Sequence, residues 1–295
     1  MSGARVVLAW MLGLVLAVAV VALEVAVVLS TTVLNPAFVT SELAGVELHP
    51  LIAERARESF PPELALFADT VDEVAPDLES WAHEQLPAVV QAATSYLRGE
   101  QDFRVVVSME QPKRVLGAHI EELLRNAEAA EMLGIPPARV EAIVAFVLQQ
   151  LDNLVPDVLV IDETFLDAQT LGVLRQARSY VSYLELSLKV LPIVCILSVL
   201  LIAALCSWRL KLAARYAGAS LCVAGIAVLA VAGLAPVYLP RAIPGAIPAQ
   251  LVAFVPGFVA DCCRPLFAYA TATLAAGAVV LLAVLWREGR GRTGG

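Results

Sequence analysis

The chain has 295 residues, of which 59% are hydrophobic and 16% are charged, and its formal net charge is −8 at pH 7. So apolar a composition excludes an ordinary water-soluble domain and indicates a membrane protein, whereas the charged share indicates that much of the chain lies in water. The acidic residues are concentrated in residues 31–186, which excludes nucleic acid as a partner of that segment.

Four long apolar segments predict four transmembrane helices. Residues 6–30 carry one charged side chain, Glu24, and residues 190–208, 216–239 and 266–286 carry none. Each segment meets the requirement of roughly 20 residues for crossing a bilayer core of about 30 Å. We therefore predict an α-helical polytopic membrane protein, with spans at residues 1–30, 187–208, 216–239 and 265–286.

Basic residues beside the spans predict the orientation. The link at residues 209–215 holds three basic residues and no acid, and the tail at 287–295 holds three against one. Basic loops stay in the cytoplasm, so both termini are expected there and residues 31–186 are expected outside the cell membrane. This outer segment has 25 acidic and 10 basic residues, a net charge of −15, which leaves +7 for the rest of the chain.

The first apolar segment has an alternative interpretation as a cleaved signal peptide, because the basic residue Arg5 precedes it. Its apolar run exceeds the usual length of about 7–15 residues, and no clear cleavage site ends it, so we expect a retained span. Cleavage would leave three spans and would not change the sides predicted for the later loops.

The outer segment, residues 31–186, is predicted to be a mainly helical domain with a minor β component. An amphipathic stretch is expected from residues 35–36 to 58, with Ser41 as the N-cap of its helix. A second helical region follows residues 61–62. We expect it to be interrupted near Pro76 and to end at Gly99.

Two further helices and two short strands are expected later in this domain. The helices open at Pro112 and at residues 136–137, because proline fits the first turn of a helix. Residues 102–108 and 158–161 favour strands, which should pair and rest on the helices. No Gly or Pro lies between residues 173 and 191, so the last helix of the domain should run unbroken into the second span.

Proline recurs every four residues at the start of the predicted outer loop, residues 240–264. Because proline removes a backbone donor and blocks the preceding helical turn, residues 237–247 are expected to be extended. Residues 248–263 are expected to form a short interfacial helix. We interpret the loop as a strap that rests on the outer domain or the headgroups; a lipid or partner groove around Pro240 and Pro244 is the alternative.

Glu24 and two adjacent cysteines are candidates for function within or beside the membrane. Glu24 has two possible positions: at the outer headgroups near water or Lys189, which we favour, or inside the bilayer, where it would have to pair or bind a proton. Cys262 and Cys263 lie at the outer end of the fourth span. We expect two free thiols there; a vicinal disulfide, an intermolecular bridge and a lipid anchor are the alternatives.

Catalytic chemistry is not predicted. The sequence contains no H-E-x-x-H, G-x-S-x-G, P-loop or G-x-G-x-x-G motif. Glu79 with His83, and His119 with Glu122, have the helical spacing of metal-ligand pairs, but a solvated acidic helix face is the simpler interpretation. No catalytic residue, cofactor or metal site is therefore expected.

Small residues predict close packing of the third and fourth spans. Such residues let two helix backbones approach closely inside a membrane. The second span is rich in leucine and isoleucine and suits a lipid-facing position. The small residues of the expected contact are Gly218, Cys222, Gly225 and Gly233 in the third span, and Ala268, Ala272, Ala276 and Gly277 in the fourth.

One span, a large outer domain and three further spans form a layout that resembles the membrane subunits of mechanotransmission-type ABC transport systems. The resemblance covers topology only and implies an accessory transporter subunit, and no family is assigned from it. We expect a non-enzymatic interaction or sensing component, with the lipid bilayer and a protein on the outer side as its partners. The transporter subunit is the first alternative, and a membrane-anchored enzyme with an unidentified site is the second.

Overall fold

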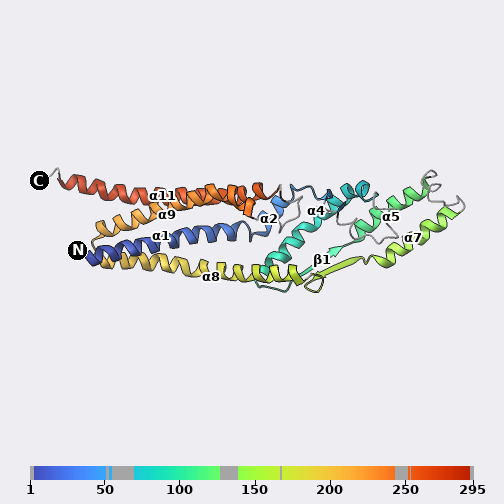
Figure 1. The fold of residues 1–295 in the computed structure, drawn as a ribbon, viewed down its shortest axis with the longest axis horizontal. Coiled ribbons are helices and arrows are strands. Elements are labelled where there is room, and N and C mark those ends of the chain that lie inside the picture. Colours follow the sequence, from blue (N-terminus) through green and yellow to red (C-terminus); the bar gives the residue numbers. More distant parts are fainter. Residues whose placement is uncertain are drawn as a thin grey trace. The chain divides into compact units, whose positions relative to one another are not determined.

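The computed structural model describes residues 3–50, 53–54, 70–126, 139–166, 168–242, 252 and 254–292. The chain is mostly helical and divides into two compact units (Figure 1). The span unit comprises residues 1–38 and 179–295, and the central unit comprises Val39–Arg178.

Within the described residues, four helices are long and apolar enough to cross a membrane. They are α1 (Gly3–Thr31), α8 (Ala168–Leu205), α9 (Leu210–Ala242) and α11 (Val255–Arg292). This finding confirms the predicted helical, multi-pass architecture. It also confirms that the last helix before the second span continues into that span, because α8 is one unbroken helix.

The turn between α8 and α9 is shorter than the predicted basic link at residues 209–215. Ser207 and Trp208 adopt left-handed backbone conformations, with φ of 52° and 58°, and α9 begins at Leu210. Such conformations cost roughly 1–2 kcal/mol in residues other than glycine. The turn therefore reverses the chain within a few residues, and Lys211 and Arg215 lie on α9 itself.

The proline-rich segment differs from the prediction. Residues 237–242 are helical, because α9 continues through Pro236 and Pro240 to Ala242. Proline has a φ that a helix can use, and each proline removes only one helical hydrogen bond, a loss that membrane helices tolerate. Pro244 lies outside the described residues. The predicted separate interfacial helix at 248–263 is also wrong in its described part, since α11 starts at Val255 and runs through Pro265 into the span.

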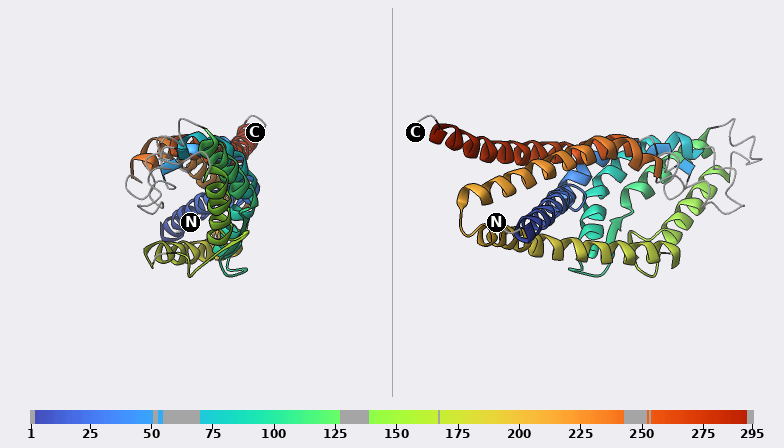
Figure 2. Two further views of the ribbon diagram at one scale, coloured as in Figure 1. Left: turned by 90° about the vertical axis from the view of Figure 1, so that its right-hand side faces the viewer. Right: turned by 60° about the vertical axis from the view of Figure 1, so that its left-hand side comes forward.

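The third and fourth candidate spans pack closely, as predicted, and α9 and α11 run side by side (Figure 2). A Cβ atom added to Gly225 would lie 2.8 Å from the backbone nitrogen of Leu274, and one added to Gly277 would lie 2.8 Å from that of Cys222. The helix backbones therefore meet at these glycines.

The alanines predicted to form this contact do not do so. Ala268, Ala272 and Ala276 are exposed, whereas Ala270 and Gly277 of the same helix are buried. The contact face of α11 is therefore rotated from the predicted row of alanines. On α9, Gly233 has no atom within 4 Å of an added Cβ and does not take part.

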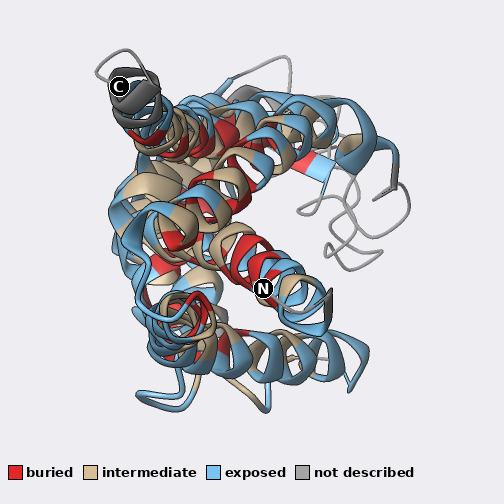
Figure 3. Cartoon of the chain, turned by 90° about the vertical axis from the view of Figure 1, so that its left-hand side faces the viewer, coloured by how far each residue is buried: buried red, intermediate tan, exposed pale blue. Residues whose placement is uncertain are grey.

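Narrow strips of buried residues hold the span unit together (Figure 3). One cluster joins Val28 of α1 to α9 and α11, and its other buried members are Val228, Ala232, Leu266 and Ala270. A second cluster joins Leu16 of α1 to Ile202 and Cys206 of α8 and Ala213 of α9. Most other residues of α8 are at least partly exposed, which agrees with the lipid-facing position expected for the second span.

The described part of the central unit includes a two-stranded sheet, three helices of 15 residues or more and the first turns of α8. Strands β1 (Arg104–Ser108) and β2 (Val158–Asp162) pair antiparallel, with Val106 opposite Val160. The helices are α4 (Thr70–Leu97), α5 (Glu110–Arg125) and α7 (Val140–Leu154). Val105 and Val107 of β1 pack against Ala92 of α4, so the prediction that the strands pair and rest on a helix is confirmed.

Two helix boundaries near the start of this region differ from the prediction. Helix α2 (Pro36–Leu43) begins at Pro36, and the side-chain oxygen of Asn35 accepts a hydrogen bond from the backbone of Ala37 at 3.1 Å. Asn35 is therefore the cap, and Ser41 lies inside the helix. Helix α4 is not interrupted at Pro76. Its predicted end is confirmed: Gly99 has a φ of 74°, which only glycine adopts without strain.

Candidate functional site

Glu24 of α1 is the acidic side chain that the structure buries most deeply among the described residues: it is 9% exposed. The hydroxyl group of Thr273, on α11, donates a hydrogen bond to its Oε1 atom. Its Oε2 atom is buried and has no hydrogen-bond partner among the described residues. The structure thus buries the Glu24 carboxyl group between helices and shows no contact with Lys189 among the described residues, while its depth in a bilayer stays a prediction.

The surroundings of Glu24 are apolar. Val21 and Val25, beside Glu24 on α1, pack against the cluster formed by α1, α9 and α11. Thr273 lies three residues beyond Ala270 of that cluster. Thr273 was not predicted as a site residue. Its hydroxyl group was the available signal, but Tyr269 and Thr271 also bring hydroxyl groups to this span, and Ser and Thr often satisfy their own helix backbone, as Thr271 does.

The other predicted membrane residues lie elsewhere on the span unit. Pro240 is within the last turns of α9, and Cys262 and Cys263 are in the early turns of α11. Cys263 is buried and Cys262 is partly exposed, and the expectation of two thiols at this place stays a prediction. No interaction described in the structure joins these residues to Glu24.

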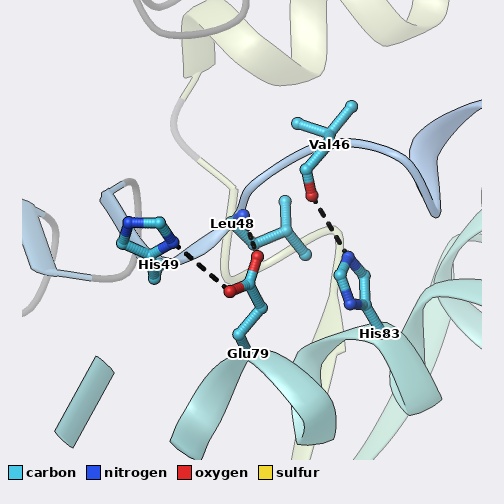
Figure 4. Close-up of polar contacts among 5 residues, drawn as sticks. All are labelled: Val46, Leu48, His49, Glu79 and His83. Carbon is cyan, nitrogen blue, oxygen red and sulfur yellow. Dashed lines mark hydrogen bonds and ion pairs between the residues drawn. The ribbon is translucent and has the colours of Figure 1, made fainter. Parts of the chain in front are cut away.

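A polar cluster in the central unit fastens residues 46–49 to α4 (Figure 4). Glu79 accepts a hydrogen bond from the backbone nitrogen of Leu48 at 2.7 Å, and its second oxygen lies 3.3 Å from Nδ1 of His49. One turn later on α4, Nε2 of His83 lies 3.2 Å from the carbonyl oxygen of Val46. Two side chains of α4 therefore bind neighbouring points of one segment.

The backbone contact also lowers the pKa of Glu79. The hydrogen bond from Leu48 is the main reason why the pKa of Glu79 is lowered; burial opposes this effect, and His49 and His83 assist it. The sequence paired Glu79 with His83 because they are one turn apart. The structure pairs Glu79 with His49 and directs His83 to the backbone, so these residues hold a segment in place.

The chemistry of these two places differs. Glu24 places a carboxyl group with one hydrogen-bond donor in an apolar setting, whereas the pKa of Glu79 is lowered by its contact with a backbone N–H. In the part of the chain that the structure describes, no group of three or more His, Cys, Asp or Glu side chains is placed to bind a metal ion. Comparisons with protein-family models, with curated proteins and with solved structures find no match.

Proposed function

We propose that this chain is a non-enzymatic, multi-pass protein of a cell membrane that presents its acidic segment, residues 31–186, on the outer side. In this proposal both termini are cytoplasmic, and the protein acts as an interaction or sensing component for an outer protein partner. The distribution of charge supports this orientation, since the net charge is −15 in the outer segment and +7 in the rest.

The continuous helix α8 is the main observation that supports this proposal. Its first turns, up to Arg178, belong to the central unit, and its remaining residues belong to the span unit. At about 1.5 Å per residue, its 38 residues extend for roughly 57 Å, well beyond a bilayer core of about 30 Å. A change in the central unit thus has a continuous helix through which to reach the membrane.

The sheet of the central unit offers a surface for the partner. Val106, Val158 and Val160 are 53%, 51% and 37% exposed and share one face of the two strands. The opposite face, with Val105 and Val107, is buried on α4. Exposed apolar residues that gather on a domain in water are typical of a protein interaction surface.

Photo-crosslinking in native membranes tests this function. A photoreactive amino acid replaces Val106 or Val160 in the full chain, and Glu141, whose side chain is 80% exposed on α7, serves as the matched control position. We expect one outer protein to crosslink at the valines and not at Glu141. Equal crosslinking at all three positions would contradict a specific surface.

Affinity purification of the full chain from the same membranes distinguishes the transporter alternative from an interaction or sensing component. Copurification of a cytoplasmic ATPase with the full chain would favour an accessory transporter subunit, and in that case α8 would carry conformational changes outward from the ATPase. Copurification of an outer protein without an ATPase favours the interaction or sensing component.

A further inference from the structure

We propose that Glu24 is a proton-binding site inside the span unit, and that it holds a proton on Oε2 while α1 and α11 are packed together. This inference is independent of the proposed function. It rests on the burial of Glu24, on the hydrogen bond that Thr273 donates to Oε1, and on the buried Oε2 atom without a partner among the described residues.

The number of hydrogen-bond donors favours the neutral acid. An ionised carboxylate is an acceptor only, and two oxygens that share one negative charge both require donors when water is excluded. The described surroundings of Glu24 provide one donor, the Thr273 hydroxyl, to one oxygen. A neutral carboxyl group fits this arrangement, because its carbonyl oxygen accepts the hydrogen bond and its other oxygen carries the proton.

Charged neighbours do not compensate a carboxylate at this position. The charged residues described on α9 are Lys211, Arg215 and Arg241, and the nearest on α11 to Thr273 is Arg264, more than two turns away. Arg264 pairs with Asp261 at 3.2 Å. On α8, Glu185 is partly exposed and Lys189 is exposed, and neither forms an ion pair with Glu24 in the described structure. An unpaired carboxylate buried in a membrane helix bundle is strongly disfavoured.

The proposed ligand is a proton and not a calcium or magnesium ion. Calcium and magnesium require about six oxygen ligands. Here the described side-chain oxygens are those of Glu24 and Thr273, and the adjoining cluster consists of valine, leucine and alanine. A proton needs a single oxygen, which Oε2 supplies.

A hydrophobic carbodiimide tests the protonated state in the full chain, reconstituted in lipid nanodiscs. Dicyclohexylcarbodiimide takes up the carboxyl proton on one nitrogen, the carboxyl oxygen adds to its central carbon, and an O-to-N acyl shift leaves a stable N-acylurea. Exposed carboxylates are ionised at about pH 7 and react slowly. We expect labelling of Glu24, located by peptide mass spectrometry, to be at least roughly tenfold greater than that of any acid in Val39–Arg178.

Infrared spectroscopy tests the protonation state of Glu24 even if the carbodiimide cannot reach this residue. The difference spectrum between the wild type and Glu24→Gln at about pH 7 should show loss of a protonated-acid carbonyl band. Glu141→Gln, at an exposed position, should show loss of carboxylate bands instead. Loss of carboxylate bands in Glu24→Gln would overturn the proposal, whatever the labelling result.

A second variant keeps the test decisive if Glu24→Gln does not fold. Thr273→Val removes only the hydroxyl group that donates to Oε1. If Oε1 is the carbonyl oxygen of a neutral acid, its band should move to higher frequency in this variant, because a hydrogen bond to it is lost. A spectrum in which only carboxylate bands move would show that Glu24 is ionised.

Discussion

At the scale of single residues, the contact between Glu79 and the backbone of Leu48 joins a carboxylate of α4 to the residue just before the helical residues 49–50. The accepted hydrogen bond stabilises the charged form and so lowers the pKa of Glu79. By linkage, the stabilisation is fully present above the ordinary pKa of glutamate and is lost as pH falls through the lowered value. Acid should therefore release residues 46–49 from α4.

Hydrogen exchange at the Leu48 amide measures this release. Because the hydrogen bond is charge-assisted, Glu79→Gln should raise the exchange rate at about pH 7 by roughly tenfold or more. In the wild type, the protection of this amide should be constant near neutrality and should decrease below about pH 4. Glu84→Gln, at an exposed position on the same helix, is the control and should leave the Leu48 amide protected. Equal exchange in both variants would count against the contact.

Spacing along the chain predicted individual side chains only in part. It identified Glu79, His83 and Glu24 as residues to examine, because their charge or periodicity is visible in the sequence. It did not provide their partners: His49 is 30 residues from Glu79, and Thr273 is 249 residues from Glu24. Contacts at such separations depend on how the helices pack, which no local pattern contains.

At the scale of elements, the close approach of α9 and α11 depends on individual glycines. Gly225 and Gly233 both lie in α9, so replacing either with alanine gives the same gain in helix propensity, about 0.5–1 kcal/mol. They differ in what a methyl group would meet: the backbone of Leu274 at 2.8 Å for Gly225, and nothing within 4 Å for Gly233.

This pair of glycines provides a matched stability test. Gly225→Ala should destabilise the protein by about 1–3 kcal/mol, because the added methyl group pushes the two helices apart. Gly233→Ala should be neutral or stabilising. Thermal unfolding of both variants in the same detergent measures the difference, and similar melting temperatures for the two would contradict the contact between α9 and α11.

Helices and strands were easier to predict from the sequence than side-chain contacts, except where a helix contains proline. The two runs of β-branched residues predicted strands that pair, because neither is stable alone, and β1 and β2 do pair. The rule that proline ends a helix predicted a break near Pro76 and an extended chain at residues 237–247, but α4 continues through Pro76 and α9 continues through Pro240 to Ala242. That rule describes the loss of one hydrogen bond, whereas the packing of the whole helix decides whether the helix continues.

At the scale of the whole molecule, hydrophobicity alone predicted the four candidate spans, because the thickness of the bilayer sets the length of an apolar helix. The sides of the membrane depend on the basic residues beside the spans and remain a prediction. A reporter fused after Arg292 should be active in the cytoplasm, and one inserted at Gly99 should be active outside. Activity of both reporters on the same side would contradict the four-span topology.

The unbroken course of α8 has a rotational consequence. A helix turns by about 100° per residue, so one alanine inserted after Tyr183 would turn the membrane part of α8 by about 100° relative to the part that precedes it. Seven inserted residues would change this phase by only about 20° but would lengthen the helix by about 10 Å. If signalling depends on rotational phase, the single insertion should abolish the response to the outer partner and the seven-residue insertion should restore it. If it depends on length, the longer insertion should be the more damaging one.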